Sequence, residues 1–114
     1  MLGLAVVLFL AAALGGLYMA THIFRGRMPP VAIAVIHGGA AATALVVTIM
    51  AAMAPGAAPL VKYGAAILFV AALGGFFLAS FHLRGVAHPK AIVVVHALAA
   101  VAGVGCLAAV LLGL

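Results

Sequence analysis

Histidine is the residue of this chain best able to do chemistry. The sequence contains five histidines and one cysteine, and it contains no aspartate or glutamate. Without carboxylates the chain can form neither a Ser-His-Asp triad nor a catalytic carboxylate pair, and it has no glycine-rich phosphate loop. The composition therefore argues against a hydrolase or a phosphoryl-transfer enzyme, and we expect no catalytic activity from this chain on its own.

His37 and His96 form the most informative pair. Each lies seven residues after a proline, Pro30 or Pro89, at which a helix is expected to begin. At a rise of about 1.5 Å per residue, both imidazoles should lie ~10 Å below the same membrane surface. An ionisable side chain at that depth in a membrane indicates a functional site. We therefore hypothesise that His37 and His96 are metal ligands.

Two facing imidazoles suit a planar macrocycle with two axial ligands. Diagonal helices of a bundle lie roughly 12–14 Å apart, which accommodates one imidazole, an edge-on porphyrin and a second imidazole. We therefore expect heme b between the second and fourth helices. Arg25, Arg84 and Lys90 lie one to two turns nearer the surface, where heme propionates would need cations.

Other interpretations of the histidines remain open. A buried neutral histidine can donate to a backbone carbonyl, and Gly-Gly pairs can simply permit close helix packing. Such bonds would favour a cofactor-free structural subunit of a larger membrane complex. His22 and His82 are weaker candidate metal ligands, because they could also bind a quinone carbonyl or anchor the chain at the interface. Histidines lining a path for a metal ion or solute are a third interpretation, although a cation route normally uses acidic residues.

The elements that position these residues are four long apolar segments. The chain is 71% hydrophobic and 4% charged, so water cannot be its main solvent. A span of ~20 apolar residues crosses a bilayer, and the candidates are Leu2–Phe24, Val31–Ala54, Leu68–Leu83 with a lead-in from Tyr63, and Ala91–Leu114. We expect an all-α integral membrane four-helix bundle forming a single domain over residues 1–114. The five basic residues are expected to be membrane-surface anchors, with no role in nucleic-acid binding.

The sequence matches itself when it is shifted by 59 residues. Between positions 12 and 41, 15 of 30 residues are identical to their partners, and the matches include Gly15-Gly16, Arg25-Gly26, Pro30 and His37. We therefore predict two tandem helix-hairpin repeats, residues 1–55 and 60–114. Because each repeat contains two spans, the repeats should share one orientation and be related by a pseudo-two-fold axis along the membrane normal.

Charge placement predicts the topology. The first and third loops carry four of the five lysines and arginines, and the middle loop carries only Lys62. By the positive-inside rule, the first and third loops should be cytoplasmic and both termini outside, in what we expect to be a bacterial inner membrane.

With its paired histidines, basic loops and four spans, the chain resembles small four-helix membrane b-type cytochromes, including the membrane anchors of succinate dehydrogenase. The resemblance covers the whole chain as architecture and rests on no diagnostic motif. It implies a heme and a quinone-linked electron path. It also implies partners: membrane lipid, and other membrane subunits or further copies in a homo-oligomer.

Overall fold

The chain forms four helices and no strand in this computed structural model, which describes all residues from Met1 to Leu114. The helices are α1 (Leu2–Phe24), α2 (Val31–Met53), α3 (Pro59–Arg84) and α4 (Lys90–Leu111). All four are long and apolar enough to cross a membrane. The predicted all-α class and the four membrane-length helices are therefore confirmed.

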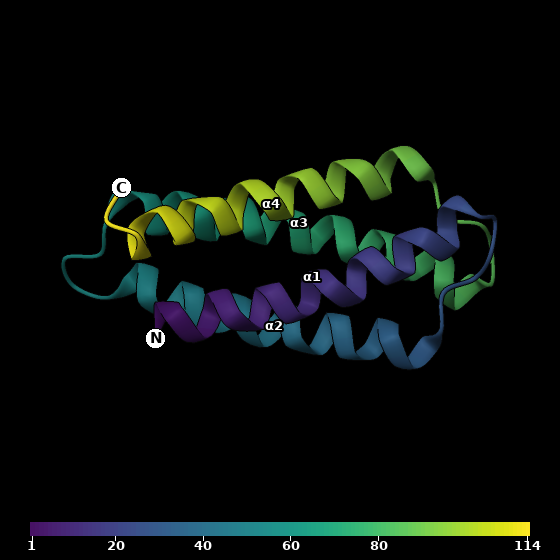
Figure 1. Ribbon diagram of the computed structural model, residues 1–114, viewed down its shortest axis with the longest axis horizontal. Helices are drawn as coiled ribbons and strands as arrows, with labels where there is room; N and C mark the ends of the chain where they lie inside the picture. The colour runs from purple at the N-terminus through teal and green to yellow at the C-terminus, as the bar shows by residue number, and fades with distance from the viewer.

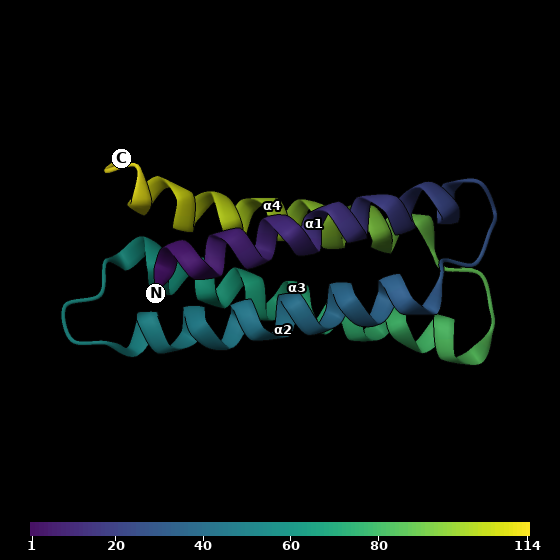
Figure 2. The same ribbon diagram turned by 60° about the horizontal axis from the view of Figure 1, so that its bottom comes forward.

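The helices run up and down as one elongated bundle (Figures 1 and 2). Helix α1 packs against α2 and α4, and α3 packs against the same two helices, so α2 and α4 are diagonal partners. Both termini and the middle loop lie at one end, and the first and third loops lie at the other (Figure 1). The bundle is 45 Å long, whereas a bilayer's hydrocarbon core is about 30 Å thick, so its length is sufficient to cross that core.

The helix boundaries follow from glycine and proline. Gly26 and Gly85 adopt left-handed backbone conformations with φ of 72° and 65°, which a residue without Cβ adopts at little cost, and they end α1 and α3. Helix α3 begins at Pro59, earlier than the sequence pattern predicts, because proline suits the first helical position. Helix α4 ends at Leu111, three residues before the predicted end.

The apolar core occupies the half of the bundle that holds the termini and the middle loop. Its fully or nearly buried residues are Phe9, Ala44, Val61, Leu68 and Leu107. In the other half, His37 and His96 lie against the glycine pairs of α1 and α3, and the apolar side chains of Leu78 and Val93 are also buried there.

Glycine permits the closest helix approach in the apolar half. A Cβ on Gly103 of α4 would lie 2.5 Å from Cγ of Leu68 on α3, and one on Gly64 would lie 3.1 Å from the Gly103 carbonyl oxygen. Gly103 is one of the small residues that follow His96 along α4. Its small size is explained by packing against Leu68, without reference to a cofactor.

Candidate functional site

His37 links α2 to α1. Its Nδ1 lies 2.7 Å from the carbonyl oxygen of Ala12. A Cβ on Gly16 would lie 2.9 Å from His37 Cε1, and one on Gly15 would lie 3.6 Å from His37 Cβ. The Gly15-Gly16 pair is therefore the surface on which this imidazole rests. A larger side chain there would displace the ring from its hydrogen bond.

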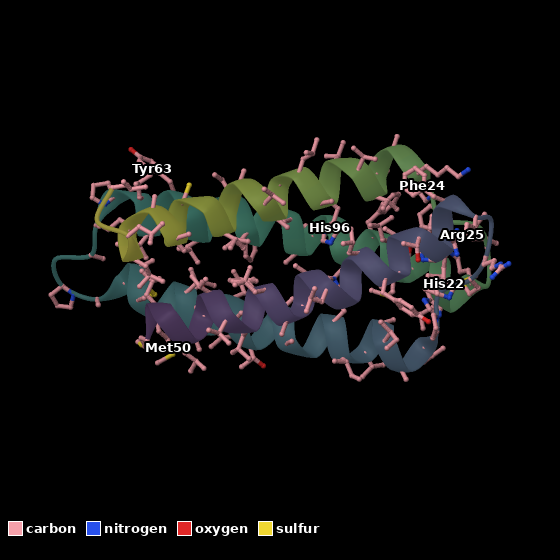
Figure 3. The ribbon with its side chains drawn as sticks, viewed as in Figure 1. His22, Phe24, Arg25, Met50, Tyr63 and His96 are labelled. Atoms are coloured by element: carbon pink, nitrogen blue, oxygen red, sulfur yellow. The ribbon has the colours of Figure 1, made fainter.

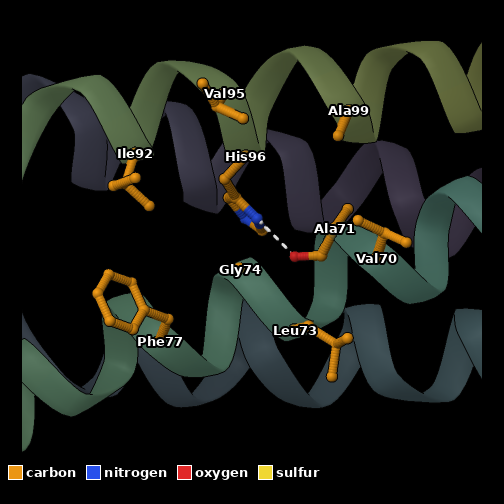
Figure 4. A pocket seen from close by; sticks show the side chains of 9 residues that line it. All are labelled: Val70, Ala71, Leu73, Gly74, Phe77, Ile92, Val95, His96 and Ala99. Atoms are coloured by element: carbon orange, nitrogen blue, oxygen red, sulfur yellow. Dashed lines mark hydrogen bonds between the residues drawn. The ribbon is translucent and has the colours of Figure 1, made fainter.

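His96 makes the corresponding link between α4 and α3. Its Nδ1 lies 2.8 Å from the carbonyl oxygen of Ala71, as Figure 4 shows. A Cβ on Gly75 would lie 3.1 Å from His96 Cε1, and one on Gly74 would lie 3.7 Å from Nδ1. Each of these residues lies 59 positions after its counterpart in the first hairpin. The same glycine-histidine arrangement is therefore built twice.

The two imidazoles meet inside the bundle although their helices are diagonal partners. The ring centroids of His37 and His96 lie 6.3 Å apart, with an angle of 74° between the ring planes. Both side chains are part-buried. The structure thus brings together the two residues that the sequence analysis pairs.

Each of these imidazoles keeps one nitrogen free of hydrogen bonds within the chain. Nδ1 must donate, because a carbonyl oxygen can only accept, and a neutral ring then carries its lone pair on Nε2. Nδ1 makes the only hydrogen bond of either ring. The two Nε2 atoms are therefore the chemically available groups of the site.

The three basic residues expected near propionates take different positions. Arg84 turns back along α3, where Nε donates to the Ser80 carbonyl oxygen at 3.1 Å and the guanidinium lies 4.5 Å from the ring centroid of Phe81. Arg25 is exposed at the loop end of the bundle (Figure 3). Lys90 lines a cavity between the first and third loops, together with Arg27, a residue that the sequence analysis did not single out.

The remaining histidines lie nearer that end. His22 Nδ1 lies 3.1 Å from the Tyr18 carbonyl oxygen on its own helix, and Figure 3 places its side chain beside the loops. His82 Nε2 is buried without a hydrogen-bond partner, and its ring centroid lies 5.8 Å from that of His88. A loop position suggests a solvated His88, but its ring is partly buried against Phe81 and His82.

These histidines do not form a conventional metal cluster. No group of three or more His, Cys, Asp or Glu side chains is arranged to hold an ion. A structural zinc site, which uses four such ligands, is therefore not formed by this chain. A heme held by two imidazoles requires only two side chains, so the absence of a group of three or more ligands does not test for it.

Searches against protein-family models, curated proteins and solved structures find no match to this chain. The function must therefore be inferred from the residues and their geometry.

Proposed function

We propose that the protein is a membrane electron-transfer protein or subunit that holds one heme b between α2 and α4, with His37 and His96 as axial ligands. The observation that carries the proposal is the 6.3 Å separation of the two ring centroids. With metal–nitrogen bonds of ~2.0 Å, two imidazoles on opposite faces of one iron have ring centres about 6 Å apart. A direct hydrogen bond between two Nε2 atoms would bring the rings about an ångström closer than that.

The hydrogen bonds to Ala12 and Ala71 support the same proposal. A metal-ligating histidine almost always donates its other ring N–H to a carbonyl or carboxylate, which sets the tautomer and the ring orientation. His37 and His96 both donate from Nδ1 to a carbonyl oxygen, at 2.7 and 2.8 Å. When each ring is neutral, its lone pair is therefore on Nε2, where it can bind iron.

The glycine pairs support the proposal through the positions of the imidazoles. A Cβ on Gly16 would lie 2.9 Å from His37 Cε1, and one on Gly75 would lie 3.1 Å from His96 Cε1. The glycines therefore allow each ring to lie against the neighbouring helix with its Nδ1 bonded to a backbone carbonyl.

A heme bound at this site would supply one-electron chemistry. The chain's own part is to hold the macrocycle by His37 and His96 and to exclude water from it. Arg25, which is exposed at the loop end of the bundle, offers positive charge toward which propionates would be oriented. Because the loops are short, the electron donor and acceptor would be quinone or other membrane subunits.

The finer architecture belongs to this proposal. We infer that the two hairpins, residues 1–55 and 60–114, are repeats related by a pseudo-two-fold axis along the membrane normal. Such an axis would carry His37 onto His96 and make the two ligands equivalent. We also infer a bacterial inner-membrane location with the first and third loops in the cytoplasm.

The second candidate is a cofactor-free structural subunit, and the same hydrogen bonds favour it. Each bond joins the two helices of one hairpin, so it stabilises that hairpin whether or not Nε2 binds a metal. Thirty-one large hydrophobic side chains are exposed on the bundle, which leaves ample apolar surface for contact with lipid or other subunits. A structural subunit would have no functional need for the rings of His37 and His96 to face each other.

The visible spectrum of the detergent-purified protein separates the two candidates. Expressed with ample heme, the wild-type protein should show a b-type reduced-minus-oxidised spectrum. His37→Ala and His96→Ala should each abolish it, and His88→Ala should leave it intact. His22→Ala and His82→Ala test for a second heme, because loss of half the heme per protein would reveal one.

His37→Asn is the sharpest variant. The asparagine amide can replace Nδ1 as the donor to Ala12, but it has no counterpart of Nε2. A heme protein should lose its spectrum in this variant, while the variant apoprotein keeps most of the thermal stability of the wild-type apoprotein. A colourless wild-type protein would rule out the cytochrome proposal and leave the structural subunit.

A further inference from the structure

A cavity of about 440 Å³ lies between the first and third loops. The two loops belong to different hairpins, and both contribute to the lining, which includes Gly26, Arg27, Met28, Gly85, His88 and Lys90. The two loops that line it lie at the end of the bundle opposite the termini (Figure 1). It is distinct from the space between His37 and His96.

The positive charge at this cavity has no counter-ion within the protein. The chain contains no aspartate or glutamate. Arg27 and Lys90 line the cavity directly. Cations held near a low-dielectric region attract anions more strongly than they would in water. The cavity therefore has the electrostatics of an anion site.

The backbone adds to the same field. Helix α4 begins after Pro89 and has no side-chain cap. The N–H groups of Lys90 and Ala91 make no backbone hydrogen bond, because the first such bonds of α4 are those from Ile92 and Val93 to the Pro89 carbonyl oxygen. Free N–H groups and the positive end of the helix dipole favour an anion at this position.

His88 contributes a donor that can respond to an anion. Burial, and then the neighbouring His82, lower the pKa of His88 below its ordinary value. The ring is therefore neutral near pH 7 and donates one N–H. An anion in the cavity would favour its protonated form and so strengthen binding as the pH falls.

The position of the cavity and its apolar lining indicate which class of anion would bind. The cavity lies at one end of four membrane-length helices in a bundle 45 Å long, and in a bilayer with a core about 30 Å thick this end would lie at headgroup depth. Its lining also includes the apolar side chains of Ile23 and Met28. Cations beside apolar groups at a membrane surface match a phosphate attached to acyl chains better than a freely soluble ion.

We propose that the cavity between the first and third loops binds the phosphate of an anionic phospholipid, through Arg27, Lys90 and the start of α4. The proposal does not depend on heme, because none of these groups is an axial ligand.

The test is lipid binding by the delipidated full-length chain. Native mass spectrometry in detergent would compare phosphatidylglycerol with the zwitterionic phosphatidylcholine. Wild-type protein should prefer phosphatidylglycerol. Removing each cation should weaken binding about fivefold, and the double variant Arg27→Gln/Lys90→Gln about 25-fold. The charge-conserving variant Arg27→Lys/Lys90→Arg should retain most of the affinity, which separates charge from folding.

Lys62 supplies the matched control, because it is an exposed basic residue at the end of the bundle opposite the cavity. Lys62→Gln should leave binding unchanged. Equal binding of the two lipids, or equal losses in Lys62→Gln and Arg27→Gln/Lys90→Gln, would overturn the proposal. Inorganic phosphate that binds as tightly as the lipid would make this a soluble-anion site and would also overturn it. His37→Ala should bind lipid normally, so failure of the heme proposal is distinguishable from failure here.

Discussion

The imidazole of His37 lies in the space that a side chain on Gly16 would need. A Cβ at that position would be 2.9 Å from Cε1 and 3.2 Å from Nδ1, and Nδ1 is the atom bonded to the Ala12 carbonyl oxygen. Gly16→Ala should therefore displace the ring, break the hydrogen bond and destabilise the protein by about 1–3 kcal/mol. Thermal unfolding in detergent would measure this loss.

Gly38→Ala is the control for that substitution, because no atom lies within 4 Å of a Cβ at Gly38. Alanine should be neutral or stabilising there, by up to about 1 kcal/mol of helix propensity. Equal stabilities of the two alanine variants would show that the His37 ring moves aside freely and that the glycine is not required.

Gly103 should be intolerant of any side chain. A Cβ on Gly103 would lie 2.5 Å from Leu68 Cγ and 2.8 Å from its Cδ2, so Gly103→Ala should destabilise the protein by about 1–3 kcal/mol. Gly105→Ala, on the same helix, has open space around it and should have little effect. In the double variant Gly103→Ala/Leu68→Ala, the smaller side chain at position 68 leaves room for the new Cβ, so part of the lost stability should be recovered. Additive effects in that double mutant would contradict the proposed contact.

His88 should make stability depend on pH. Its pKa is lowered first by burial and then by His82, and Arg27 and Lys90, which line the same cavity, stay charged throughout. The folded pKa is below the unfolded one, so the stabilisation is complete above about pH 6.5 and is lost as the pH falls through the folded pKa. His88→Gln should reduce the fall in unfolding temperature between about pH 7.5 and pH 5. Parallel pH profiles for wild type and variant would contradict this.

Topology can be measured by cysteine labelling. Cys106 is the only cysteine, so replacing it and placing one cysteine in each loop gives three matched proteins. Four of five basic residues lie in the first and third loops, and we expect an impermeant reagent added outside to label the middle loop only. Labelling of the other two loops instead would reverse the assignment.

Much of the architecture was predictable from local sequence. Leu2–Phe24 forms a helix with the predicted bounds, because an uninterrupted apolar run can satisfy its backbone in a membrane only as a helix. Gly26 and Gly85 end α1 and α3 as their residue type predicts. The equal depth of His37 and His96 was also predictable from their equal spacing from a proline, whereas the facing of their rings depends on helix packing.

The partners of individual side chains were decided by tertiary structure. Composition and spacing do not show that Gly16 is covered by an imidazole or that Gly103 faces Leu68, because each contact depends on how two helices rotate about their axes. For the same reason the sequence did not show that Arg84 turns back onto Phe81, whereas Arg27 and Lys90 line one cavity. Spacing along a helix sets a residue's depth, but the packing of neighbouring helices determines which groups it meets.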